Sequence, residues 1–240
     1  MPEPHVPAPY GTEGGLYRAL RAGAAGAWER YCWHPFVRGL ADGSLPAAAF
    51  RRYLVQDYLF LTQFARAQAL AVVKAESPAA MREKSEVLGA VLGETSLHLG
   101  YCAEWGLDEA AVLDQPEEVE TVAYTRWVMD EGLRGDILDL EVALAPCTVG
   151  YGEIALRIRA HPSYQRSGNL YESWIAQYAG TGYQALAASA AARLDALGAS
   201  HGGTARLPAL VRSFATASEL EAGFWSMGLR APGPDLGNAA

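Results

Sequence analysis

The stretch ALAPCTVGYGEIAL, residues 143–156, holds the cysteine whose surroundings most suggest chemistry. Cys147 follows Pro146, which removes a backbone donor and is expected to disturb the helix locally. A helical period places Cys147 and Tyr151 on one apolar face, with Leu140, Leu144, Ile154 and Ile158. A buried free cysteine is more often inert packing than a nucleophile, because it behaves as a small hydrophobic residue. The pattern alone leaves both interpretations open.

Two acidic side chains also fall on apolar helical faces. In FRRYLVQDYLFLTQFARAQAL, Asp57 shares a face with Tyr53, Phe60 and Phe64. Glu221 takes a similar position in SELEAGFWSMGL, among aromatic and small residues. A buried carboxylate without a partner costs on the order of several kcal/mol, so each acid needs a hydrogen-bond partner or a cavity. A structural hydrogen bond and a ligand site are equally open for Asp57 at this point.

Three tyrosines, Tyr124, Tyr151 and Tyr178, lie on apolar stripes of three different segments. Taken singly, each is best interpreted as a core residue whose hydroxyl finds a partner. If these faces converge with those of the thiol and the two acids, they enclose a polar cavity with aromatic walls. Such a cavity suits a flat heteroaromatic ligand, which stacks on rings and donates hydrogen bonds to buried carboxylates.

The segments that must position these residues have a helical apolar period nearly everywhere. Ser77-Pro78 is typical of an N-cap followed by proline, and residues 42–46, DGSLP, of a turn before a helix. No alternating strand pattern is found, so we expect an all-α fold with a single helical bundle. We predict a flexible N-terminal tail at 1–14, one helical domain at 15–230 and a C-terminal tail at 231–240. The predicted helices cover residues 15–32, 46–75, 78–105, 117–133, 136–160, 168–180, 182–197 and 205–229.

Composition excludes several classes of protein. The 240 residues carry a formal net charge of −8, and no basic cluster is dense enough to bind nucleic acid. Three widely spaced cysteines favour a reducing compartment, and the Pro- and Gly-rich N-terminus does not resemble a secretory signal. The longest uncharged stretch, residues 173–192, is too polar to span a membrane. We therefore expect a soluble, cytoplasmic protein without a membrane or nucleic-acid partner.

Familiar catalytic motifs are missing from the sequence: there is no GxSxG, P-loop, dinucleotide glycine fingerprint or HExxH. Glu94 and His98 are spaced i, i+4 and could both touch a metal ion. One such pair is a weak signal, and a solvent-facing ion pair is the simpler interpretation. His34, before Pro35, is expected to be structural. No metal or cofactor is predicted.

Four segments, in this order and spacing, resemble the TenA family of thiaminase II proteins: HPFVRGLADGSLPAAAFRRYLVQDYLFLTQFARAQAL, APCTVGYGEIALRI, YESWIAQYAGTGY and ELEAGFWSMGL. The resemblance runs from about residue 15 to 230. It implies a haem-oxygenase-like bundle that needs no haem, a homotetramer and a role in thiamin salvage. Family members hydrolyse 4-amino-5-aminomethyl-2-methylpyrimidine to the hydroxymethylpyrimidine and ammonia, and many also cleave thiamin.

The resemblance also assigns roles to residues. It places the nucleophile at Cys147, the acid/base at Glu221 and the pyrimidine-binding aspartate at Asp57, with tyrosines at 124, 151 and 178 in support. The cysteine puts the chain in the cysteine-bearing branch of the family. Two positions depart from the pattern: Phe60 stands where tyrosine is common, and Thr148-Val149 where bulky aromatics are common. A cavity of different shape is therefore expected.

These residues predict covalent catalysis, in which Cys147 adds to a pyrimidine ring held by Asp57 while Glu221 moves protons. Two other functions are conceivable on this scaffold. One is a non-catalytic pyrimidine-binding or regulatory protein, which Phe60 makes possible. The other is a metal-dependent oxidase of the haem-oxygenase-like type, for which too few acidic and histidine residues share helical faces.

Overall fold

The computed structural model describes residues 9–230, apart from the side chains of residues 96 and 97. Within this range the chain is mostly helical and has no β-strand, which confirms the all-α fold. The helices are α1 (Leu16–Gly23), α2 (Ala25–Cys32), α3 (Pro35–Asp42), α4 (Ala47–Lys74), α5 (Pro78–Glu104), α6 (Glu109–Leu113), α7 (Val119–Arg134), α8 (Ile137–Ala160), α9 (Glu172–Tyr178), α10 (Thr181–Ser200) and α11 (Gly203–Leu229).

The long helices agree with the sequence pattern, and the short ones near the N-terminus do not. The helix predicted at 15–32 is interrupted at Ala24, which separates α1 from α2. Gly23 precedes the break, and a Cβ added there would come within 2.7 Å of the Val211 side chain on α11. Close packing of α1 on α11 therefore depends on this glycine. Helices α3 and α6 were not predicted.

Local signals set the helix starts. The Ser77 hydroxyl accepts from the Ala80 amide at 3.1 Å and caps α5 as predicted. Asp136 begins α8 with a capping box, in which its carboxylate and that of Asp139 accept from each other's backbone amides. His34 caps α3 through Nδ1, which accepts from the Phe36 amide at 3.2 Å, so its role is structural as expected.

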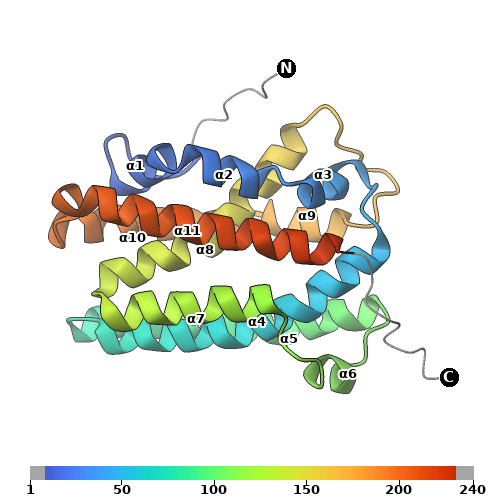
Figure 1. Cartoon of the computed structure of the whole chain (residues 1–240), viewed down its shortest axis with the longest axis horizontal. Coiled ribbons are helices and arrows are strands. Elements are labelled where there is room, and N and C mark those ends of the chain that lie inside the picture. Colours follow the sequence, from blue (N-terminus) through green and yellow to red (C-terminus); the bar gives the residue numbers. More distant parts are fainter. Residues whose placement is uncertain (1–8, 231–240) are drawn as a thin grey trace.

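The helices form two layers joined by α8 (Figure 1). Helices α4, α5 and α7 lie side by side in the lower layer of the view, and α11 and α10 lie in the upper one. Helix α8 crosses between the layers and packs against α7, α10 and α11, whereas α5 packs mainly on α4. The core between the layers is rich in aromatic residues, with Trp225 at the centre of a cluster of rings.

Helix α8 continues through Pro146 without a break in its assigned range. Pro146 lacks a backbone N–H and so cannot donate one hydrogen bond of the helix, but the disturbance predicted here does not interrupt the helix. The Tyr31 hydroxyl donates to the Pro146 carbonyl at 3.2 Å, so this tyrosine from α2 lies directly on α8. Gly150 permits the approach, since a Cβ added there would lie 2.3 Å from the Tyr31 ring. The turn that carries Cys147 is thus held against α2.

Part of the predicted N-terminal tail packs on the bundle. Of the two tails, residues 1–8 and 231–240 lie outside the described residues. Tyr10 is buried, however, and its hydroxyl donates to Gln184 Oε1 on α10 at 2.6 Å. Among the described residues, no helix combines the length and apolar composition needed to cross a bilayer.

Candidate functional site

A cavity of about 60 Å³ lies between α4 and α5 on one side and α8, α9 and α10 on the other. By volume it holds about four to six water molecules, the scale of a small substituted ring. One face of α4 lines it with Asp57, Leu61, Phe64 and Gln68, at i, i+4, i+7 and i+11. The facing stripe of α5 consists of Val87, Ala90, Val91 and Glu94.

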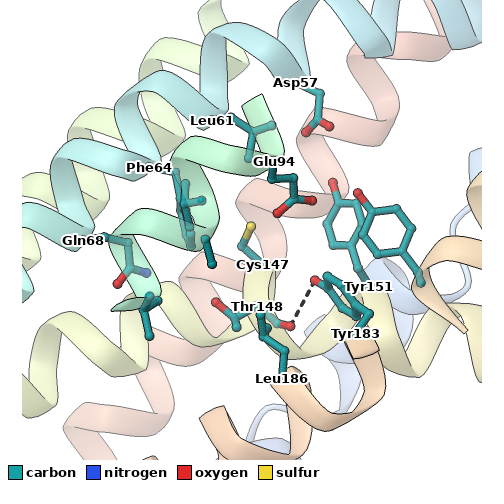
Figure 2. Close-up of a pocket in the computed structure, with 14 residues that line it drawn as sticks. Asp57, Leu61, Phe64, Gln68, Glu94, Cys147, Thr148, Tyr151, Tyr183 and Leu186 are labelled. Atoms are coloured by element: carbon teal, nitrogen blue, oxygen red, sulfur yellow. Dashed lines mark hydrogen bonds between the residues drawn. The ribbon is translucent and has the colours of Figure 1, made fainter. Parts of the chain in front are cut away.

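Four of the predicted site residues meet at this cavity. Cys147 and Tyr151 reach it from α8, Tyr178 from α9 and Asp57 from α4. Figure 2 shows Asp57, Cys147 and the tyrosine rings on different walls of the same space. The tyrosine rings pack together, with ring centroids of Tyr151 and Tyr178 5.1 Å apart. The apolar faces predicted on three separate helices thus meet at one cavity with an aromatic wall.

Three other predicted residues do not line the cavity. Glu221 is only 2% exposed, and its Oε1 accepts from the Tyr124 hydroxyl at 3.0 Å. Phe60 packs against Tyr124, with ring centroids 5.0 Å apart. Position 60 is not part of the cavity wall, because the Phe60 side chain packs in the layer of residues behind it. A phenylalanine in place of a tyrosine there therefore changes no lining residue. Glu221 and Tyr124 likewise lie outside the cavity wall.

Asp57 is held by two neighbours. The Tyr53 hydroxyl donates to Asp57 Oδ2 at 3.0 Å, and His98 Nδ1 lies 3.5 Å from the same oxygen. The other ring nitrogen of His98, Nε2, is 2.9 Å from the Leu54 carbonyl, which can only accept, so Nε2 carries a proton. Burial raises the pKa of Asp57, while His98 and the Tyr53 hydrogen bond oppose that rise. A proton between His98 Nδ1 and Asp57 Oδ2 makes the contact between these two side chains attractive.

The Cys147 thiol is surrounded by acids. Burial raises its pKa well above the usual value, and the charges of Glu221, Asp57 and Glu94 raise it further. Burial also raises the pKa of Glu221 to about 8, with the Tyr124 hydrogen bond opposing and the charge of Asp57 adding to the rise. At neutral pH the thiol is therefore protonated, and Glu221 is largely protonated. Nucleophilic attack requires that the thiol proton be taken up during the reaction.

Thr148 and Val149 differ in their effect on the cavity. Thr148 lines it with a small side chain. The backbone carbonyl of Thr148 accepts from the Tyr183 hydroxyl at 3.1 Å, which fixes Tyr183 over this wall (Figure 2). Val149 is fully buried in the core and does not touch the cavity. The predicted change of shape therefore concerns Thr148.

The sequence interpretation of Glu94 and His98 is wrong. They do not form a solvent-facing ion pair, because His98 is 7% exposed and contacts Leu54 and Asp57, while Glu94 lines the cavity. Tyr183 and Gln68 were also missed as lining residues. The position of Glu94 could have been predicted from its spacing with Val87, Ala90 and Val91, which share one helix face. These three side chains are small, however, so the face is only weakly apolar.

No group of three or more His, Cys, Asp or Glu side chains within residues 9–230 is placed to hold a metal ion. Glu94 and His98 share a helix face, yet the two ring nitrogens of His98 are turned to a carbonyl and to Asp57. The cavity wall is instead suited to hydrogen bonding and stacking with an organic ligand.

The fold and cavity define an all-helical protein with an acid-lined site for a small ligand. The chain belongs to the TENA/THI-4/PQQC family, whose profile matches residues 21–231. It is 35% identical over 203 residues to the aminopyrimidine aminohydrolase of Halalkalibacterium halodurans, covering 83% of this chain and 89% of that protein.

Two solved structures have the same fold as this chain. The crystal structure of a TenA family transcription regulator from a Silicibacter species is 42% identical and superposes with a TM-score of 0.86, covering 94% of this chain and all of that one. A domain from Shewanella denitrificans with a heme oxygenase-like fold superposes with a TM-score of 0.65 at 15% identity, over 86% of this chain and 89% of that one. The haem-oxygenase-like architecture is thereby confirmed.

Proposed function

We propose that this protein is an aminopyrimidine aminohydrolase of thiamin salvage, of the thiaminase II type. It would convert 4-amino-5-aminomethyl-2-methylpyrimidine and water into the hydroxymethylpyrimidine and ammonia. Similarity to an aminopyrimidine aminohydrolase over most of the chain supports this function. The observation that carries it is that the Cys147 thiol and the Asp57 carboxyl line the same aromatic-walled cavity.

In the proposed mechanism, Asp57 binds the amino group and ring nitrogen of the pyrimidine, and the tyrosines pack against the ring. Tyr53 and His98 hold the Asp57 carboxyl in place from behind. Cys147 adds to the electron-poor ring while its thiol proton passes to the ring nitrogen through the Asp57 carboxyl, and the exocyclic C–N bond then breaks with its electron pair leaving on nitrogen. The proton returns to sulfur when the C–S bond later breaks. Water takes the place of the amine, and the thiol is released.

The amine leaves as ammonia: Glu221 supplies the proton when the amine is neutral, whereas a protonated amine needs none. In its ionised form Glu221 then accepts a proton from the attacking water. A carboxyl with a pKa of about 8 carries a proton at neutral pH and returns to that state easily, which suits this two-way role. Tyr124, which donates to Glu221, holds this carboxyl in place. No cofactor takes part in these steps.

The test is the release of ammonia and hydroxymethylpyrimidine from the aminopyrimidine, with thiamin followed in a parallel reaction. Cys147→Ala should lower kcat by at least about 100-fold, since no other thiol lines the cavity. Cys102→Ala, which alters a fully buried cysteine on α5, is the matched control. Near-normal ammonia release by Cys147→Ala would refute the nucleophile. Tight product binding without turnover by the unmodified protein would favour a binding or regulatory protein.

We further propose a cytoplasmic homotetramer. Three free cysteines spread over the fold suit a reducing compartment. Helix α5 presents Met81 and Leu92 to solvent, with 43% and 52% of these side chains exposed, as expected of a face covered by another subunit. Light scattering on the purified protein should give four times the chain mass of 25.7 kDa.

A further inference from the structure

Glu94 is the carboxyl in the cavity wall to which the mechanism above gives no role. It reaches the cavity from α5, and no hydrogen bond or ion pair to its carboxyl is found among the described side chains. Figure 2 shows this carboxyl between Asp57 and the Cys147 sulfur, directed toward the tyrosines. A group in this position contacts whatever lies between Asp57 and Cys147.

The cavity wall carries acidic groups and no cationic side chain. Its ionisable members are all acids: Asp57, Glu94, Cys147, Tyr151, Tyr178 and Tyr183. His98, the nearest base, lies behind Asp57 and is turned away from Glu94. Burial and the charge of Asp57 raise the pKa of Glu94 to about 7, which reflects the lack of a positive neighbour. A cation bound here would restore the ionised carboxylate.

Glu94 also marks the boundary between two ends of the cavity. Figure 2 places Asp57, Tyr151 and Tyr183 on one side of Glu94 and Leu61, Phe64 and Gln68 on the other, so the first end is polar and the second mainly apolar. The lining face of α4 from Asp57 to Gln68 spans about 16 Å at 1.5 Å per residue, longer than one pyrimidine ring. A ring held by Asp57 at the polar end directs its remaining substituents toward this boundary.

We propose that Glu94 is a specificity residue that binds the positively charged nitrogen on the 5-substituent of the pyrimidine. The inference rests on the proposed function. An aminomethyl group is an alkylamine and, like a lysine side chain, is protonated at neutral pH. Asp57 binds the ring edge and Glu94 binds the ammonium group. The neutral hydroxymethyl product lacks this contact, and phosphorylated pyrimidines are repelled by the acidic wall.

The test compares two ligands that differ in this substituent alone, the aminomethyl and the hydroxymethyl pyrimidine. Calorimetric titrations use the full chain carrying Cys147→Ala, so that the amine is not consumed. Glu94→Gln keeps the size of the side chain and removes its charge, while Glu94→Asp keeps the charge. Glu86→Gln, on an exposed position of the same helix, is the matched control.

Glu94→Gln should raise the Kd of the aminomethyl ligand by about 10- to 100-fold, the range of a charge-assisted hydrogen bond. It should change the Kd of the hydroxymethyl ligand less than about threefold. Glu94→Asp should keep most of the preference for the amine, and Glu86→Gln all of it. Equal weakening of both ligands by Glu94→Gln, or no weakening of either, would overturn the role of Glu94. If neither ligand binds when Glu94 is intact, the proposed function itself is refuted, and the inference with it.

Discussion

The buried carboxyl of Glu221 should make the stability of the protein depend on pH, and Glu221→Gln should remove this dependence. Glu221 is 2% exposed and its pKa is raised to about 8, whereas the unfolded chain has the ordinary value of 4.5. Between these two pH values the folded state binds a proton that the unfolded state has lost. Stability therefore falls as pH rises through this window.

The magnitude follows from the slope of about 1.36 kcal/mol per pH unit for one proton. From pH 5 to pH 7 the wild-type protein should lose roughly 2 to 3 kcal/mol that Glu221→Gln does not lose. The glutamine keeps the Tyr124 hydrogen bond, because its side-chain oxygen also accepts. Asp57 and Cys147 are present in both proteins, so their own titration cancels to first order.

Urea unfolding of both proteins at pH 5, 6, 7 and 8 measures this difference directly. The stability of Glu221→Gln minus that of the wild type should rise steadily from pH 5 to pH 7, rise less steeply between pH 7 and pH 8, and level off only above pH 8. Glu219→Gln is the control, since Glu219 on the same helix is exposed and pairs with Arg30 in solvent. A difference for Glu221→Gln that stays constant over this range would show that the carboxyl titrates normally and would refute the reasoning.

Three further outcomes follow from the structure. Burial and nearby acids raise the pKa of Cys147, so its thiol should react with iodoacetamide at pH 7.5 at least about tenfold more slowly than free cysteine. Mass spectrometry of the modified peptide measures this rate, and a rate faster than that of free cysteine would show a preformed thiolate and contradict the prediction. Lys84→Met should cost about 3 to 5 kcal/mol in urea unfolding by leaving Glu141 buried and unpaired, and a loss below 1 kcal/mol would contradict this. Gly150→Ala should destabilise by about 1 to 3 kcal/mol through a clash with a buried tyrosine ring, unlike Gly223→Ala, which has open space; equal effects would disprove the clash.

Helical periodicity predicted the faces that carry Asp57, Cys147 and Tyr151, because bulky apolar neighbours define those stripes. The same reasoning predicted that Glu221 is buried, which is confirmed, but it could not show whether Glu221 lines the cavity. Periodicity shows that a residue faces the core of the bundle, but not whether a cavity or another side chain meets it there. For Glu221 the partner is Tyr124, whose hydroxyl on a different helix donates to its carboxyl, and neither residue lines the cavity. Only the relative depth of α7, α8 and α11 decides this.

Glu94 was misplaced for a different physical reason. The stripe of α5 that faces the cavity includes Ala90, and glycines such as Gly89 and Gly93 lie beside it, so no large apolar residues identify the inner face. A helix that borders a cavity has less apolar surface to bury than one that packs tightly. The break between α1 and α2 was not predicted, because Gly23 is required there by close contact with the Val211 side chain, and Val211 is distant in the sequence.

The buried acids outside the cavity show that this fold can neutralise a carboxylate with a strong cation. Glu153 pairs with Arg21 and also accepts from Trp28, and Glu141 pairs with Lys84. Around the cavity, within the described part of the chain, the only basic side chain near Asp57 is His98, and neither Glu94 nor Glu221 has an ion pair. Burying acids in this way costs stability, and pairing them with Lys or Arg would recover much of it. A ligand that brings its own positive charge restores that balance only when it is bound, so the unpaired acids favour an amine-bearing substrate over its neutral product.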